Sequence, residues 1–164
     1  MGFEATGADI TQGAFWRTVG ARPVGATVIT ASHDAGPVGF LGLSFAHVSA
    51  EPPTVLVSAG KNTSALPVIR AAEHFAVNLL PAGADEMARL FGGSAEMAER
   101  FAAGRWGSFT TGAPVLETAA AVFDCRLEKT VEDEGAVILI GRVEGVRTNG
   151  DGVTLAHQGG YRDL

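Results

Sequence analysis

The sequence lacks most of the residue patterns that carry chemistry in proteins. Cys125 is its only cysteine, so no internal disulfide can form, and its four histidines have no histidine or cysteine partner at zinc-site spacing. Neither a Gly-x-Ser-x-Gly elbow nor a Gly-x-Gly-x-x-Gly loop occurs. The chain therefore gives no support to a disulfide-rich scaffold, a structural zinc module, a serine hydrolase or a Rossmann dinucleotide fold.

Positive charge and long apolar runs are also scarce. The only lysines are Lys61 and Lys129, and the formal net charge is −6. This balance argues against a nucleic-acid partner, because that role needs a clustered basic face. No apolar run approaches the length of a membrane span. The first nine residues contain an acid and no basic region, so we expect no secretion signal and a cytoplasmic location.

The overall composition is that of a globular protein. Hydrophobic residues make up 46% of the chain and charged residues 18%, which is typical of neither a disordered nor a membrane protein. The chain contains no repeat or linker that would divide it, and its 164 residues suffice to bury a core. We expect one domain over residues 1–164.

Strand-like patterns dominate both ends of the chain, and helical patterns its middle. We expect strands at residues 25–31, 38–48, 54–58, 75–80, 119–130 and 136–147. We expect helices at residues 11–19, from Ser64, at 84–91 and from Ser94. Because strands and helices do not alternate, this order favours a mainly β barrel or sandwich with helical insertions over a doubly wound α/β fold.

Single features add detail to this outline. Cys125 lies in an apolar strand pattern and is expected to be buried and inert. Residues 147–152 carry two glycines among turn-forming residues and predict a hairpin turn. Residues 155–164 are expected to pack against the barrel or a partner. Four large aromatic residues are expected in the core: Trp16, Phe91, Phe101 and Trp106.

A group of polar residues precedes one of the predicted helices. Residues 61–63 read Lys-Asn-Thr. Proline has no backbone N–H, so Pro67 belongs in the first helical turn, which makes Ser64 the N-cap and Pro67 the third helical residue. Unpaired N–H groups at a helix N-terminus attract phosphate, and a lysine beside them adds charge. Taken alone, the pattern still favours a capped surface helix with a solvated Lys61.

Motifs spread over nearly the whole chain match one known family. The most specific is the Val-Ser-x-x-Pro-Pro block at residues 48–53, followed by the basic-polar-polar run at 61–63. Supporting segments are residues 15–17, 25–30, 44–47, 75–80, 100–101, 106, 112–116, 125, 141–143 and 160–161. The chain thereby resembles the flavin reductase-like proteins, which supply reduced flavin to two-component monooxygenases. The resemblance implies a split β-barrel of the FMN-binding, Greek-key type, and a homodimer with the flavin near the subunit interface.

The resemblance also implies which residues meet the flavin. The ring is expected against two segments and their border: Leu43, Ser44 and Phe45; Val57, Ser58 and Ala59; and Pro23 with Val24. The phosphate is expected at three further residues: Lys61, Asn62 and Thr63. This carry-over favours a functional Lys61 over a solvated one.

The chain departs from the family pattern at several positions. Leu41, Leu43 and Ala65 stand where family members often have polar side chains, which predicts a lower affinity for the flavin phosphate. The family's Gly-Asp-His signature on the nicotinamide side reads Gly-Ala-Val at residues 135–137. His47, at a position usually filled by serine, is the one candidate for a partial substitute. A histidine that is merely hydrogen-bonded at a strand end is its equal alternative.

Hydride transfer between two stacked rings needs no acid, base or nucleophile from the protein, so no catalytic residue is assigned. The leading hypothesis is a reductase that uses NADH or NADPH to reduce FMN or FAD for a flavin-dependent monooxygenase. Two alternatives stay open. One is an oxidoreductase that retains its flavin and reduces another acceptor, and the other is a diverged binding protein of the same fold. The sequence does not choose between the two flavins, between the two nicotinamides, or among partners.

Overall fold

The computed structural model describes residue 7 and residues 9–164 of the protein. The expectation of no secretion signal rests on residues that lie mostly outside this part. Four helices occur in it: α1 (Gln12–Gly20), α2 (Ala65–Ala72), α3 (Asp85–Gly92) and α4 (Met97–Ala102). None of the described helices combines the length and the apolar character that crossing a membrane requires.

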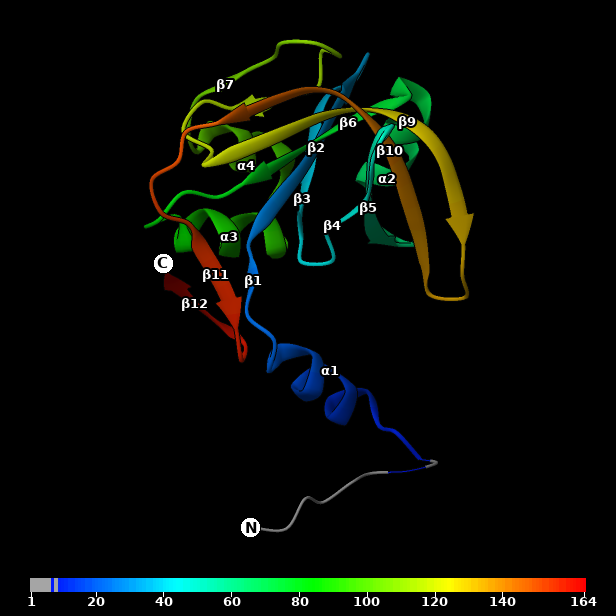
Figure 1. Ribbon diagram of the computed structural model, residues 1–164, viewed down its shortest axis with the longest axis vertical. Helices are drawn as coiled ribbons and strands as arrows, with labels where there is room; N and C mark the ends of the chain where they lie inside the picture. Colours follow the sequence, from blue (N-terminus) through cyan, green and yellow to red (C-terminus); the bar gives the residue numbers. More distant parts are fainter. Residues whose placement is uncertain (1–6, 8) are drawn as a thin grey trace.

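Seven strands form one antiparallel sheet in the order β3-β2-β6-β9-β10-β5-β4. Their bounds are β2 (Thr27–His33), β3 (Gly36–Gly42), β4 (Ala46–Ala50), β5 (Pro53–Gly60), β6 (His74–Leu79), β9 (Ala121–Glu132) and β10 (Ala136–Thr148). A smaller sheet joins β1 (Val24–Gly25), β11 (Thr154–His157) and β12 (Gly160–Asp163), and a third joins β7 (Trp106–Gly107) to β8 (Val115–Leu116). Strands dominate both ends of the chain, with helices between them (Figure 1), as predicted.

The two edge strands of the large sheet follow one another in the chain. β3 lies at one edge and β4 at the other, and only residues 43–45 connect them. We call Leu43, Ser44 and Phe45 the crossing segment. Because this segment is so short, the sheet must curl until its two edges meet, although no ladder joins β3 to β4 within the described residues. The result is the split barrel that was predicted.

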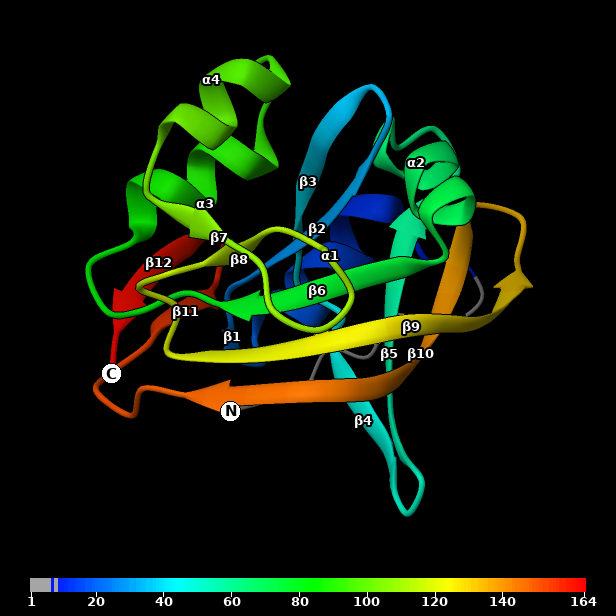
Figure 2. The same ribbon diagram turned by 90° about the horizontal axis from the view of Figure 1, so that it is seen from above.

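Helices cover the barrel on two sides. Figure 2 shows α3 and α4 together on one side and α2 on the other, with β2 and β3 between them. Inside the barrel, Ile69 of α2 packs with Phe75 and Leu139. Under α3 and α4, Phe91 packs with Leu116 in a second apolar cluster. The phosphate-binding segment predicted before α2 is thus carried by a helix that is anchored in the barrel core.

Three of the four aromatic residues pack as predicted. Phe91 is buried, and Phe101 and Trp106 are half-buried around it, with ring centroids 5.5 Å and 5.6 Å from that of Phe91. The prediction for Trp16 is wrong, because 60% of this residue is exposed. Its helix, α1, buries no residue and extends away from the rest of the described chain (Figure 1), so Trp16 lies outside both core clusters.

Two predictions about strand connections are also wrong. Residues 38–48 do not form one strand, because the chain leaves β3 after Gly42 and enters β4 at the opposite edge. Residues 147–152 do not close a hairpin, because β10 and β11 belong to different sheets. The expected positive φ angles do occur there, at Gly150 (80°) and Gly152 (72°). Residues 155–164 fold back as β11 and β12 against β1, which agrees with their predicted packing.

A buried arginine ties the helical side to the barrel. Arg100 of α4 is 8% exposed. Its guanidinium donates to three backbone carbonyls, from Nε to Ala95 at 2.9 Å and from the two Nη atoms to Gly39 and Gly93 at 2.7 Å each. These bonds satisfy a buried cation without a carboxylate and join α4, the loop before it and β3.

Candidate flavin site

The segment between β5 and α2 gathers positive charge and hydrogen-bond donors. Lys61 is exposed and takes part in none of the ion pairs of the described residues. Its backbone N–H donates to Gly135 O at 3.3 Å, and that of Thr63 donates to Gly60 O at 2.9 Å. The backbone N–H groups of Asn62 and Ser64 donate to no group in the described part of the protein. Two free donors and an unpaired ammonium therefore lie before α2, where helix polarity favours an anion.

The start of α2 agrees with the proline argument but not with the predicted cap. Pro67 is the third helical residue, as predicted. Ser64 occupies the N-cap position, but its backbone is helical (φ −63°, ψ −21°) and its side chain makes no capping hydrogen bond. The reason is that the turn already begins at Thr63, whose carbonyl accepts from the Leu66 N–H at 3.1 Å. The exposed Ser64 hydroxyl is therefore not consumed by the helix.

The crossing segment is anchored at both of its ends. Before it, the Thr27 hydroxyl donates to Gly42 O, and a Cβ at Gly42 would come within 2.8 Å of the Ile29 side chain. At its other end, the ring of Phe45 packs against that of Phe123, with their centroids 5.0 Å apart. The side chain of Leu43 is left exposed. The segment thus has a fixed course although it belongs to no strand.

The middle of the crossing segment is bonded to the end of β5. The backbone N–H of Ser58 and its hydroxyl both donate to Ser44 Oγ, each at 2.9 Å. Ser44 Oγ in turn donates to Ser58 O at 3.4 Å. The backbone N–H groups of residues 43–45 donate to no group among the described residues. Both segments that the resemblance assigned to the flavin ring therefore lie side by side, and the crossing segment offers unpaired donors.

The turn between β9 and β10 lies against residues 59–61. We call its residues 133–135, which read Asp-Glu-Gly, the acidic turn. Besides the bond from Lys61 to Gly135, Ala136 pairs with Gly60 and Val137 with Ala59. Val137 is 1% exposed and belongs to the barrel core. A histidine carried over to this position would point into the core, so only Ala136 of the two departures faces the candidate site.

The structure separates the remaining predicted residues from the Ser44–Ser58 contact. His47 pairs with Val55, and successive side chains of a strand alternate between faces, so His47 lies on the face opposite to Ser58. Pro23 is exposed, and Val24 pairs with Ala156 in the three-stranded sheet. Both residues precede β2 in the chain. Thr27 of β2 pairs with Gly42, which lies just before the crossing segment. Leu41 packs against Gly92 and the second apolar cluster.

Two features of the site were not predicted. One is the Ser44–Ser58 bonding, and the other is the contact of the acidic turn with Lys61. Each depends on strand register, which pairs residues distant in sequence. The predicted burial of Cys125, by contrast, is confirmed: the residue is fully buried, and burial raises the pKa of its thiol to about 12.

The candidate site combines the ammonium of Lys61 with a rim of backbone N–H donors that have no partner among the described residues. A family profile described as "Flavin reductase like domain" matches residues 19–164. The chain belongs to this family. This flavin reductase-like protein is 40% identical over 124 residues to the FMN reductase (NADH) RutF of Cronobacter sakazakii, covering 76% of this chain and 75% of that one.

Solved structures of the family share the fold. Nitrilotriacetate monooxygenase component B of Mycobacterium thermoresistibile is 29% identical, with a TM-score of 0.86 over 93% of this chain and 86% of that chain. The NADH:FAD oxidoreductase SgcE6 of Streptomyces globisporus is 28% identical, with a TM-score of 0.88 over 97% of each chain. This flavin reductase-like protein therefore shares its fold with these two structures over most of their length.

Proposed function

We propose that this flavin reductase-like protein is an NAD(P)H-dependent flavin reductase, folded as one domain, that reduces FMN or FAD. One observation carries the proposal: two sets of free donors meet at the end of β5. Lys61 and two free N–H groups lie between β5 and α2, and the crossing segment, with its own free N–H groups, is bonded to Ser58 of β5. The naming of relatives supports it, since RutF is an FMN reductase (NADH) and SgcE6 is an NADH:FAD oxidoreductase.

The residues present fit a flavin. Lys61 with the N–H groups of Asn62 and Ser64 would hold the phosphate, and Thr63, whose hydroxyl lies near Gly60, would border it. The ring would lie against the adjoining crossing segment and end of β5: Leu43, Ser44, Phe45, Val57, Ser58 and Ala59. When bound, the flavin would accept a hydride directly from a nicotinamide ring and take up one proton from the solvent, leaving oxidised nicotinamide and reduced flavin. The protein's part is to hold the two rings in contact and to exclude water.

Leu43 and Ala136 bear on how the rings are held. Both present apolar surface where a polar contact would fix a ring edge. We therefore propose a loosely held flavin that exchanges with the medium, as a supplier of reduced flavin requires. The chemistry calls for no acid or base, which is consistent with the position of His47 on the opposite face.

Purified protein with FMN, FAD or riboflavin, and with NADH or NADPH, tests the proposal through the loss of NAD(P)H absorbance. Oxidation that rises with added flavin and saturates is the expected result. If flavin stays bound through gel filtration and added flavin has no effect, the protein is instead an oxidoreductase that retains its flavin. Absence of both flavin binding and NAD(P)H oxidation would leave a diverged binding protein. Comparison of the six substrate pairs identifies the preferred flavin and nicotinamide.

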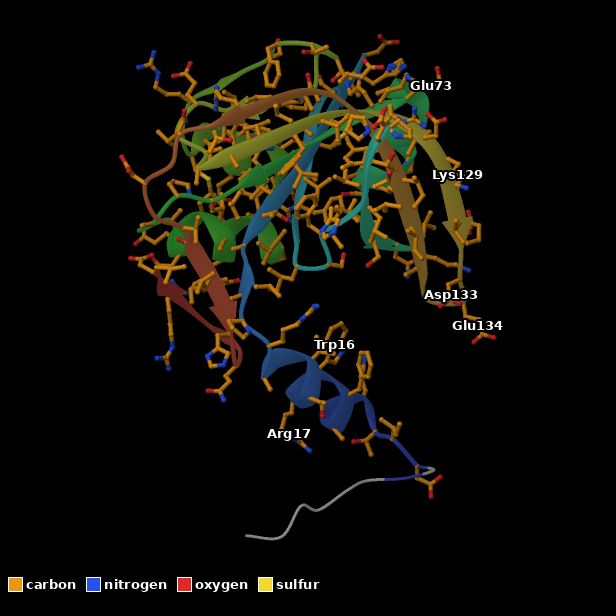
Figure 3. The ribbon with its side chains drawn as sticks, viewed as in Figure 1. Trp16, Arg17, Glu73, Lys129, Asp133 and Glu134 are labelled. Atoms are coloured by element: carbon orange, nitrogen blue, oxygen red, sulfur yellow. The ribbon has the colours of Figure 1, made fainter. Side chains whose placement is uncertain are left out.

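We also propose that two copies associate through α1. A helix of nine residues is marginal on its own, yet α1 buries no residue and exposes Phe15 (51%) and Trp16 (60%). Figure 3 shows Trp16 on the side of α1 that faces the rest of the chain and Arg17 on the opposite side. A second copy seated against this apolar side would cover it. Light scattering should give a dimer that Trp16→Glu dissociates and Arg17→Glu does not; a monomeric wild-type protein would contradict the proposal.

The partner we propose is a flavin-dependent monooxygenase in the same compartment as NAD(P)H, the cytoplasm. The relative from Mycobacterium thermoresistibile is named as component B of a monooxygenase. A reductase that releases its product needs a second protein to consume it. Transfer of reduced flavin to a purified monooxygenase, measured as product formed per NADH, would test this role.

A further inference from the structure

The β4–β5 ladder ends in an unusual way. Ala46, the first residue of β4, pairs with Leu56. Ser58 lies two residues further along β5, and Ser44 lies two residues before Ala46, so the two serines occupy the next position on the same face. The backbone of Ser44 has already left the ladder there, which would leave the N–H and C=O of Ser58 unpaired at a sheet edge.

The Ser44 side chain takes the place of the missing strand. Its Oγ accepts from the Ser58 N–H at 2.9 Å and donates to the Ser58 carbonyl at 3.4 Å, which are the two bonds that a continuing β4 backbone would supply. The Ser58 hydroxyl also donates to Ser44 Oγ, at 2.9 Å. Both hydroxyl hydrogens are therefore committed within the pair, and neither can be donated to a ligand without breaking it.

The Ser44 side chain, which replaces a strand backbone here, holds the crossing segment beside β5 while its backbone stays out of the ladder. Because a side chain does the pairing, the backbone N–H groups of residues 43–45 stay unpaired. The hydroxyl also fixes the crossing segment against residues 57–59, so that the two segments form one wall of the proposed ring site. From this geometry we infer that Ser44 is a positioning residue. It acts through Ser58, holding that wall together and freeing the backbone donors that meet the flavin, and its own hydroxyl does not contact the flavin.

This inference rests on the proposed function and is tested by binding rather than by turnover alone. Ser44→Ala should raise the dissociation constants of FMN and riboflavin by a similar factor, about 5- to 30-fold. The crossing segment, freed of its bonds to the half-buried Ser58, must be fixed again on binding at a cost of about 1–2 kcal/mol, and the ring is common to both ligands. Ser58→Ala keeps the N–H bond and should raise them by about threefold. Ser44→Thr restores the hydroxyl and should return affinity to near the wild-type value. Ser108→Ala, at an exposed serine of the β7–β8 loop, is the matched control.

Separate results identify each way the inference can fail. If Ser44→Ala lowers the melting temperature but leaves both dissociation constants unchanged at a temperature where it is folded, Ser44 serves the fold alone. If Ser44→Ala weakens flavin binding while hydrogen exchange at the Ser58 N–H stays at the wild-type rate, the Ser44 hydroxyl acts by direct contact with the flavin, which overturns the positioning role. A wild-type protein that binds no flavin refutes the proposed function instead. In the kinetics, we expect Ser44→Ala to raise the KM for flavin more than it lowers kcat.

Discussion

Replacement of Lys61 by alanine tests the phosphate end of the proposed site. The ammonium has no ionic partner among the described residues, so its loss breaks no interaction within the protein. A charge-assisted hydrogen bond contributes about 1.5–3 kcal/mol, and the exposure of Lys61 lowers this to about 1–2 kcal/mol because water screens the charge. The dissociation constant of FMN should therefore rise about 5- to 30-fold.

The ligand series makes this prediction specific. Riboflavin has the same ring without the phosphate, so its affinity for Lys61→Ala should equal that for the wild type. Lys129→Ala is the matched control, since Lys129 is the only other lysine and lies exposed on β9 (Figure 3). Fluorescence titration at low and high salt gives the constants, and the effect should shrink as salt rises. An unchanged FMN constant at low salt, or an equal loss for riboflavin, would refute the phosphate role.

Three further predictions concern the scaffold and its titrating groups. Arg100→Met should lower the free energy of unfolding by about 2–4 kcal/mol in urea titrations, because three backbone carbonyls lose their donor. Arg105→Met, at an exposed side chain, should change it by less than about 0.5 kcal/mol. Equal effects would contradict the structural role of the Arg100 hydrogen bonds. Cys125, with a pKa of about 12, should react with a thiol reagent at neutral pH only as fast as the protein unfolds, and rapid labelling of the native protein would show the burial to be wrong. Burial lowers the pKa of His74 below its usual 6.5, although Asp124 opposes this shift. The unfolded chain therefore takes up the proton first, and the free energy of unfolding falls as the pH drops below about 6.5. His74→Gln should lose less stability than the wild type over that range, and identical pH profiles would refute this.

Local rules predicted the parts of the fold that are set locally. Pro67 located the first turn of α2 correctly, because a missing N–H is tolerated in few helical positions. The strand pattern around Cys125 predicted burial, because apolar alternation reports directly on a core face. The order of the predicted elements favoured either a barrel or a sandwich, and the resemblance to the family narrowed this prediction to a split barrel.

The errors arose where pairing between distant residues decides the structure. Small and apolar residues continue through residues 38–48, so nothing in that pattern marks the break after Gly42; the break exists because β3 and β4 lie at opposite edges. The glycines at 150 and 152 have the predicted backbone angles, yet which sheet the chain enters next is not a local property. Trp16 was assigned to the core by residue type, although its helix buries no residue against the described part of the chain.

The same reasoning applies to the candidate site. Lys61, Asn62 and Thr63 were found from a helix start and a motif, which are both local. The role of Ser44 was not, because the Ser44–Ser58 contact requires the register between β4 and β5 to be known. Strand register also determines which of the two positions on the nicotinamide side faces the site. It places Ala136 beside Gly60 and directs Val137 into the core.

The most direct test of a flavin-supplying reductase is the dependence of NADH oxidation on added FMN by protein freed of flavin through gel filtration. We predict negligible oxidation without FMN, a saturating rise with FMN, and reduced FMN that passes a membrane too fine for the protein. Oxidation that does not depend on added FMN, or no oxidation at saturating FMN and NADH, would contradict the account.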